Sequence, residues 1–274
     1  MATKKTNDLP VAHVGDVPDH KLALVGQDQP DSLQTMRHHR VLNRLAVIQS
    51  NSPREKKEKF EEASIAIPAV DLKVCSKDES VLVVPVMFFD EFIQWGDRKD
   101  KTGPMIREKT VNLTSKLAAA CDDPQRWRVK YGDNQQFEAR NNHHLNFLVV
   151  IYSGPLKGTL AVASFARSEY KKGTAWMANI QQRRINGRQA PLWSQVWEFK
   201  VGPRKNEHGE WYGIDFANPS TASPWIEGQE IEAMRAMHEQ LLVDYKAQIL
   251  DVGHKEAEVA SGSGEPTPAG ETEY

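Results

Sequence analysis

Residues 192–201 have the sequence L-W-S-Q-V-W-E-F-K-V, and residues 210–216 have the sequence E-W-Y-G-I-D-F. Both segments are rich in aromatic and β-branched residues. Apolar and polar residues alternate in the first segment, as they do in a strand with one buried face. The residues between them, 202–209, include Pro, Lys, Asn and Gly, which favour a turn. The pattern predicts an antiparallel β-hairpin.

Similar β-branched or aromatic runs, separated by Pro, Gly, Asp and Asn, occur upstream of this hairpin. They predict strands at residues 64–74, 80–89, 125–129, 146–152 and 159–163. Residues 36–50 have apolar positions at helical spacing, although a strand at 45–49 also fits. Helices are expected near 110–120 and 168–182. Because the strands are short and show no βαβ rhythm, the fold class is expected to be mainly β (α+β), as an antiparallel barrel or sandwich with inserted helices.

A C-terminal amphipathic helix is predicted over residues 224–250. The Ser-Pro pair that begins at Ser223 is a typical helix start, and Gly253 is a typical end. Between Ile231 and Ile249 apolar residues recur every three to four positions, which is the spacing of one helix face. We expect this stripe to pack on the parent domain or to pair two protomers in a homodimer.

The composition indicates a folded domain with polar ends. The 274 residues are 39% hydrophobic and 26% charged, with a formal net charge of −2. We expect a disordered N-terminal arm over 1–35, a single domain over 36–250 and a disordered acidic tail over 251–274. Because no apolar run approaches the ~18 residues that span a bilayer, we expect a cytoplasmic protein without a membrane partner. Cys75 and Cys121 lack CxxC spacing, so neither a disulfide framework nor a metal or other cofactor is expected.

Charge is distributed unevenly along the chain. Residues 157–205 hold ten Lys and Arg against two acids, and residues 95–130 hold nine against five. Residues 251–274 hold six acids against one lysine. The chain therefore combines a basic middle with an acidic tail, and the tail is either a solvated segment or one that covers the basic surface and recruits partners.

Aromatic residues are interleaved with the basic ones. Proteins that bind single-stranded nucleic acid combine cations that follow the phosphates with flat rings that stack on bases. Trp95, Tyr170 and Trp176 are the stacking candidates, although a core position is an alternative for each tryptophan. The candidate nucleic-acid-binding residues are Trp95, Arg98, Lys99, Lys101, Arg107, Lys109, Arg167, Tyr170, Lys171, Lys172, Trp176, Arg183, Arg184 and Arg188.

Signals for catalysis are weaker. The sequence contains no GxSxG motif, P-loop or GxGxxG motif. Asp71 and Lys73 have the D-x-K spacing of some metal-dependent nucleases, and Glu61 or Glu62 would have to supply the second carboxylate. Adjacent histidines, such as those that begin at His143, point to opposite faces of a strand and cannot chelate one metal by themselves.

Residues 45–95 resemble a stretch found in bacteriophage single-stranded-DNA-binding proteins. The shared features are a segment that ends in Gln49-Ser50, a charged helix, the apolar run V-L-V-V-P-V-M-F-F from Val81, and then Trp95 with a basic loop. Similar proteins also have a strand after an Asn-His pair, and a segment that leads from a serine through Lys-Lys to Trp. Here these are residues 142–151 and 164–176. The resemblance covers roughly residues 40–216.

The tail has a second resemblance. Phage and bacterial single-stranded-DNA-binding proteins with an OB-fold commonly end in an acidic segment with a terminal aromatic residue, as Glu271, Glu273 and Tyr274 do here. The resemblance implies an OB-like antiparallel barrel. It also implies that the tail competes with DNA and recruits phage replication or recombination proteins in the host cytoplasm.

The first hypothesis is therefore a non-enzymatic protein that binds and protects single-stranded DNA without sequence preference. The second is a non-enzymatic phage structural or assembly protein, in which the basic stretches are a protein-docking face. The third is the metal-dependent nuclease that uses Asp71 and Lys73. The first two differ in one structural expectation, because DNA binding requires the basic stretches 96–109 and 167–188 to lie along one groove.

Overall fold

The computed structural model describes residues 40–96, 106–123, 126, 128–131, 137–207, 209–247 and 249–252. The chain divides into two units, Met1–Arg40 and Val41–Tyr274. Apart from Arg40, every described residue belongs to the second unit. The expected arm (1–35) lies outside the described residues. So does the tail beyond residue 252, including Glu271, Glu273 and Tyr274.

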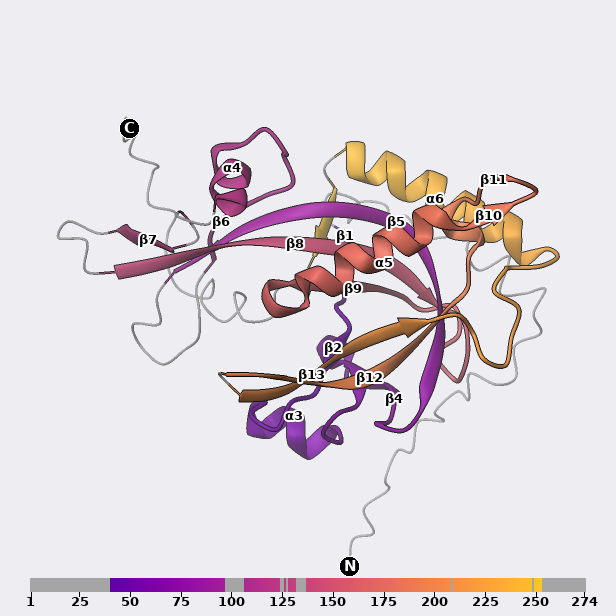
Figure 1. Ribbon diagram of the computed structural model, residues 1–274, viewed down its shortest axis with the longest axis horizontal. Helices are drawn as coiled ribbons and strands as arrows, with labels where there is room; N and C mark the ends of the chain where they lie inside the picture. The colour runs from indigo at the N-terminus through magenta and orange to yellow at the C-terminus, as the bar shows by residue number, and fades with distance from the viewer. Residues whose placement is uncertain are drawn as a thin grey trace, which may run out of the picture. The chain divides into compact units, whose positions relative to one another are not determined.

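A seven-stranded antiparallel sheet forms the centre of the second unit (Figure 1). Its strand order is β13-β12-β5-β8-β7, with β6 paired to β5 and β9 paired to β8. The strands are β5 (Ser80–Trp95), β6 (Ile106–Thr110), β7 (Arg128–Tyr131), β8 (Phe137–Ile151), β9 (Leu160–Ala166), β12 (Trp197–Asn206) and β13 (Gly209–Ala217). The mainly β, antiparallel fold class is confirmed, but the sheet is not a closed barrel, because within the described residues β13 and β7 end the strand order without pairing to each other.

Smaller elements surround this sheet. Three strands form a second sheet in the order β2-β3-β4, and β1 pairs with β14 and β10 with β11. These strands are β1 (Arg40–Leu42), β2 (Ala46–Val47), β3 (Ile65–Ile67), β4 (Leu72–Cys75), β10 (Arg184–Ile185), β11 (Arg188–Gln189) and β14 (Leu250–Val252). The helices are α3 (Arg54–Lys59), α4 (Lys116–Asp122), α5 (Tyr170–Gln182) and α6 (Glu230–Lys246), with 3-10 turns η3 (Pro68–Val70), η4 (Arg167–Glu169) and η5 (Leu192–Ser194).

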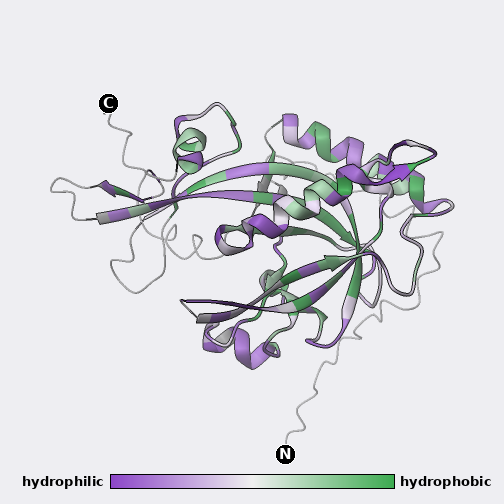
Figure 2. Ribbon diagram, viewed as in Figure 1, coloured by the Kyte–Doolittle hydropathy of each residue, from purple (hydrophilic) through white to green (hydrophobic). Residues whose placement is uncertain are grey.

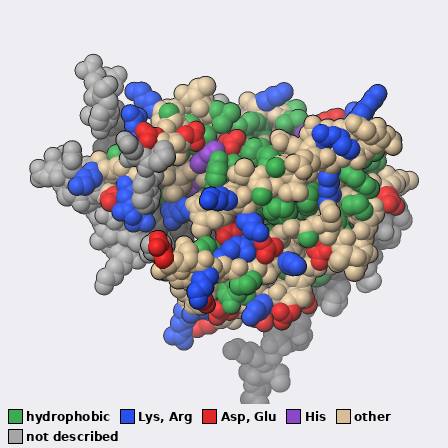
Figure 3. Space-filling model, viewed as in Figure 1, with side chains coloured by type: hydrophobic (Ala, Val, Ile, Leu, Met, Phe, Trp, Pro, Cys, Tyr) green, Lys and Arg blue, Asp and Glu red, His purple; other side chains and the backbone are tan. Residues whose placement is uncertain are grey.

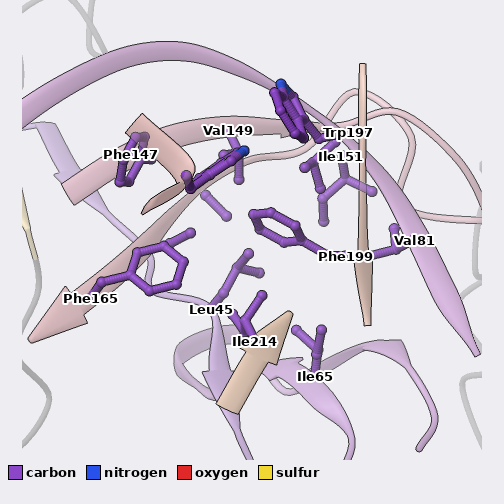
Figure 4. Packing of buried hydrophobic residues seen from close by; sticks show 14 of the residues in the cluster. Leu45, Ile65, Val81, Phe147, Val149, Ile151, Phe165, Trp197, Phe199 and Ile214 are labelled. Carbon is purple, nitrogen blue, oxygen red and sulfur yellow. The ribbon is translucent and has the colours of Figure 1, made fainter. Parts of the chain in front are cut away.

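Both faces of the central sheet are covered, which explains why β5 and β8 are apolar on both sides. Alternate residues of β8 point to opposite faces. Phe147, Val149 and Ile151 pack in one cluster with Trp176 of α5. Leu148 and Val150 pack in another with Leu241 of α6. Figure 4 shows the first of these clusters, and Figure 2 shows hydrophobic stretches on β5 and β8, with a hydrophilic stretch in the middle of β5 and along the left part of β8. We call the side covered by α5 the α5 face.

Three predicted elements differ from the structure. The strand predicted at 64–74 is broken into β3 and β4, because Pro68 begins a 3-10 turn that ends at Asp71 with a φ of 54°. The helix predicted over 224–250 begins only at Glu230, since Pro224 and Ile226 bond to the backbone beside η5 instead. Within 36–50, the described residues form the strands β1 and β2 rather than a helix.

Ser115 caps the N-terminus of α4, and its hydroxyl accepts a 3.0 Å hydrogen bond from the backbone N–H of Ala118. Replacing Ser115 with alanine leaves that N–H without its acceptor, so we expect the free energy of unfolding to fall by about 1 kcal/mol. Urea unfolding measures this change. Ser168→Ala, at an exposed serine with no such cap, is the control and is expected to change stability by less than about 0.5 kcal/mol.

Candidate nucleic-acid interface

The outer edge of β8 has a gap between two partner strands. β7 pairs with β8 as far as Arg140, and β9 pairs with it from His144 onward. Asn141 and Asn142, which lie between these points, are buried and bond through their side chains. The Asn141 amide donates to the Arg126 carbonyl at 2.8 Å, and the Asn142 carbonyl oxygen accepts from Arg167 Nε at 3.1 Å. Within the described residues, these amides connect β8 to Arg126 and Arg167 at positions where neither β7 nor β9 pairs with it.

A hollow of about 550 Å³ opens at this gap. We call it the edge cleft, and it is lined by Cys121, Asp122, Arg140, Asn141, Asn142, His143, Arg167 and Tyr170. Arg167 has a φ of 52°, which is unfavourable for a residue with a side chain and is found more often at functional sites than elsewhere. Burial raises the pKa of the Cys121 thiol to about 12, and Asp122 adds to the increase, so this thiol is uncharged at neutral pH.

A hydrogen-bonded chain of three side chains forms the inner end of the edge cleft. His143 Nε2 lies 2.7 Å from Asp90 Oδ1, and His143 Nδ1 lies 3.1 Å from the Tyr170 hydroxyl. A carboxylate oxygen can only accept, so His143 Nε2 donates to Asp90, and the Tyr170 hydroxyl and Asp122 Oδ1, at 3.5 Å, face the other ring nitrogen. Burial raises the pKa of Tyr170, and Asp90 and Asp122 raise it further. The phenol is therefore neutral and is held in place at the cleft.

Basic side chains dominate this end of the sheet. Arg107, on β6, donates to Gln94 Oε1 at 2.9 Å, and Gln94 donates to Asn141 at 2.9 Å, so Arg107 is connected to the cleft wall. The described cations are Arg107, Lys109, Arg126, Arg128, Lys130, Arg140 and Arg167, and the described acids are Asp90, Glu108, Asp122, Asp123 and Glu138. Figure 3 shows Lys and Arg side chains at this end of the molecule, mixed with Asp and Glu, and further Lys and Arg side chains over the rest of the visible face. We call this group the sheet-end cluster.

Four of these cations were missed by the sequence analysis, although three of them have a sequence signal. Residues 126–131 have the sequence R-W-R-V-K-Y, in which every second residue is basic, and β7 begins at Arg128 within this segment. The register of Arg128 and Lys130 with Arg140 and Glu138 of β8 places all four side chains on one side of the sheet. Glu138 Oε1 is 3.6 Å from both Arg128 Nε and Arg140 Nε, so one carboxylate is shared between two guanidinium groups.

The predicted binding residues at Trp95 and in the basic stretch 96–109 differ in their exposure. Arg98, Lys99 and Lys101 lie outside the described residues. Arg107 and Lys109 are exposed on β6, as expected. Trp95 ends β5 with only 9% of its surface exposed, so it offers little ring area to a base.

The second basic stretch is divided between the two ends of α5. Arg167 and Tyr170 reach the edge cleft at the N-terminal end, and Lys171 is exposed next to them. Lys172 is bound to Asp215 Oδ1 at 2.7 Å. Arg184 and Arg188 are exposed on the β10–β11 hairpin, beyond the C-terminal end of α5.

Arg183 is a structural residue, contrary to the prediction. Its guanidinium lies 3.5 Å from the ring centre of Trp197 and 5.7 Å from that of Trp225, and it donates to the carbonyls of Val196 and Pro224 and to Asn218. Burial lowers its pKa to about 10. Because these bonds connect the end of α5 to two other segments, the group is not available to a phosphate.

Trp176 is also a core residue, and the expectation that it stacks on a base is wrong. Its side chain is 0% exposed, and its ring centre lies 4.3 Å from that of Phe147 and 4.9 Å from that of Phe199. Trp176 faces the sheet because it occupies the buried stripe of α5 together with Gly173 and Ile180. Tyr170 is therefore the one aromatic candidate of the three that lines a cleft.

The residues of the nuclease hypothesis lie on the exposed surface around β4. Asp71 Oδ2 is bound to Lys59 Nζ at 2.6 Å, and Lys73 Nζ donates to Ser76 Oγ at 3.1 Å. Glu61 and Glu62 are exposed. In the part of the chain that the structure describes, no group of three or more His, Cys, Asp and Glu side chains is placed to hold a metal ion.

Fold and site together define a mainly antiparallel β-protein with a basic cleft at the end of its central sheet. The chain matches the model of the Pam3 phage gp34-like protein family over residues 34–243, and it belongs to that family. It is thus a phage-related protein, as the sequence analysis expected. No curated protein and no solved structure matches the chain. None of the helices in the described ranges is long and apolar enough to cross a membrane.

Proposed function

We propose that this protein binds single-stranded DNA without sequence preference, through the sheet-end cluster and the edge cleft. The observation that carries the proposal is that Arg140 and Arg167, from two different elements, line one cleft together with the hydroxyl of Tyr170. Guanidinium groups bind phosphate oxygens through paired N–H donors, and a tyrosine ring offers a face to a base. The cytoplasm of the host, where phage DNA is replicated, is the proposed location.

The charge distribution supports a chain-like ligand rather than a compact anion. The seven described cations of the sheet-end cluster extend from β6 through Arg126, β7 and β8 to Arg167 in η4, and five acids accompany them. Each phosphate that a cation neutralises releases condensed counterions, so affinity for a single strand falls with salt by about 0.7 log units per contact per tenfold increase. The proposal therefore requires binding that weakens strongly as salt is raised.

The test is the double charge reversal Arg140→Glu/Arg167→Glu. We expect it to weaken binding of a labelled thymidine oligonucleotide at low salt by at least about tenfold and to reduce the salt slope by about 1.4, the value for two lost phosphate contacts. Fluorescence anisotropy measures both quantities. The matched control is Arg54→Glu/Arg235→Glu, since both arginines are exposed and each is paired to a glutamate four residues on.

Equal affinity of the two double variants would contradict the proposal, because both carry the same change of net charge. Absence of any binding at low salt by the unaltered protein would also contradict it, and would favour the alternative of a structural or assembly protein. A chain that ends at Gly253 tests the acidic tail in the same assay. If the tail competes with DNA, the shortened chain binds more tightly.

A further inference from the structure

A second hollow lies on the α5 face, at the opposite end of α5 from the edge cleft. Its volume is about 410 Å³, and its walls include Phe88, Phe147, Met177, Ile180 and Leu192. Phe147 is fully buried and forms the floor, whereas Phe88 is half-buried, so Phe88 supplies the ring that a ligand can reach. We call this hollow the hairpin pocket, because its rim continues into the β10–β11 hairpin.

Polar groups on the rim of the hairpin pocket are few and uncharged. Gln181 from α5 and Gln189 from β11 line it, and each amide offers both donors and an acceptor. Pockets with apolar walls and a few polar groups at one side are typical of sites for small flat ligands. The amides would match the polar edge of a base, and the apolar walls would match its faces.

Two cations, Arg184 and Arg188, lie on the hairpin that adjoins the hairpin pocket. Residues 170–197 contain no Asp or Glu. Asn186 and Gly187 form the tip of the hairpin with φ values of 51° and 78°, the left-handed pair that a two-residue hairpin turn requires. This turn presents Arg184 and Arg188 to solvent beside the pocket. An apolar pocket beside a hairpin that carries two arginines is complementary to a nucleotide, whose base is apolar on its faces and whose phosphate is anionic.

The hairpin pocket and the edge cleft lie along the same helix and the same strands. Met177 follows Tyr170 by seven residues, and Gln181 follows Met177 by four, so the three side chains lie on one face of α5. On the sheet below, Phe88 of β5 pairs with Phe147 of β8 at the hairpin pocket. Four residues further along β5, Phe92 pairs with His143 at the edge cleft, so the same two strands connect the two sites. The 13 residues of α5 span about 20 Å. A bound strand of a few nucleotides can therefore reach both.

We propose that the hairpin pocket takes one unpaired base of a single strand whose backbone lies across the edge cleft, with Arg184 and Arg188 at the neighbouring phosphates. The inference rests on the proposed function and adds to it a specific site for a base. Stacking on one aromatic ring contributes about 1–3 kcal/mol per base. The pocket would make binding depend on the presence of bases, whereas the sheet-end cluster would bind the backbone alone.

The experiment compares two oligonucleotides of six units, one of thymidine and one of the same length with abasic sites throughout. In Phe88→Leu the ring is lost but an apolar side chain remains. We expect this variant to bind the thymidine oligonucleotide between about 5-fold and 150-fold more weakly, with unchanged affinity for the abasic one. The matched control is Tyr212→Leu, which removes a half-buried ring on β13, away from both sites.

The inference is overturned if Phe88→Leu binds both oligonucleotides as the unaltered protein does, or weakens both equally. In either case the effect of Arg140→Glu/Arg167→Glu can still stand, so failure of the pocket is distinguishable from failure of the proposed function. If Phe88→Leu does not fold, Met177→Trp tests the same point by filling the pocket from α5. The same selective loss of thymidine binding is then expected, and its absence overturns the inference.

Discussion

Replacing Trp176 with alanine is expected to lower the free energy of unfolding by about 3–5 kcal/mol, which is a large part of the stability of a typical domain. The indole is fully buried and packs against rings from three strands. Its ring centre is 4.3 Å from that of Phe147, 4.9 Å from that of Phe199 and 6.0 Å from that of Phe216. Removing it leaves a cavity between α5 and the sheet that these rings cannot fill. Urea or guanidinium unfolding measures the loss.

Trp176→Phe separates the core role from a role in binding. Phenylalanine keeps most of the apolar volume, so a smaller loss of stability is expected, and the affinity of the folded protein for an oligonucleotide should not change. The interpretation of Trp176 as a core residue is wrong if Trp176→Phe folds with normal stability but loses DNA affinity. Trp225→Phe is the control, since Trp225 is half-buried, and it measures the loss of stability expected when a partly exposed tryptophan is replaced.

The second large loss of stability is expected when Arg204 is replaced, because its side chain connects the β12–β13 hairpin to the start of α5. Its guanidinium lies 3.0 Å from Asp215 Oδ1 and 3.3 Å from Glu169 Oε1, and Trp211 Nε1 donates to the same glutamate oxygen at 3.0 Å. These three charged side chains are each no more than a quarter exposed. Arg204→Met removes the cation paired with Glu169 and leaves Asp215 with Lys172 alone, and we expect a loss of about 2–4 kcal/mol.

The pH dependence of this loss identifies its cause. Burial by itself would raise the pKa of the Asp215 carboxyl, but hydrogen bonds and charge from Lys172 and Arg204 outweigh it and hold the pKa below its usual range. A carboxyl whose pKa is lower in the folded state stabilises the protein above its ordinary pKa and loses that effect as the pH falls through the folded value. The stability difference between the unaltered protein and Arg204→Met should therefore be largest near neutral pH and narrow in acid.

Lys205→Met is the control for Arg204→Met. Lys205 forms a 2.7 Å ion pair with Glu210, but both side chains are more than two-thirds exposed, so a change of less than about 0.5 kcal/mol is expected. If the two variants lose the same stability, or if the loss at Arg204 does not depend on pH, the ionic network is not what stabilises this junction.

Two glycines show how tightly this network is packed. A Cβ atom on Gly213 would lie 2.3 Å from Glu169 Oε2, and one on Gly202 would lie 1.8 Å from Asp215 Oδ2. Gly213 occurs in a predicted strand, where glycine is ordinarily unfavourable, and Gly202 begins the predicted turn, but in the structure both lie within strands, β13 and β12. Both positions hold glycine because a carboxylate, from a distant segment at Gly213 and from the neighbouring strand at Gly202, occupies the space of a Cβ atom. No local sequence pattern contains that information.

Elements with a local signal could be predicted from the amino-acid sequence alone. The hairpin of β12 and β13, the run that becomes β5, and a C-terminal helix were predicted from alternation, β-branched content and apolar spacing. The stretches with an excess of Lys and Arg were visible in the same way. These features depend on interactions between neighbours along the chain, which is why period and composition are enough to find them.

Which of the predicted site residues face solvent could be learned only from the folded chain. Trp176 and Arg183 carry the same sequence signal as Tyr170 and Arg188, yet Trp176 is buried and Arg183 is bound to backbone carbonyls over the ring of Trp197. Tyr170 lines a cleft, and Arg188 lies on an exposed hairpin. The edge cleft itself arises because β7 and β9 pair with different parts of β8 and leave a gap between them. Burial and strand register depend on contacts between residues far apart in the chain, and a pattern of residue types in one segment does not contain them.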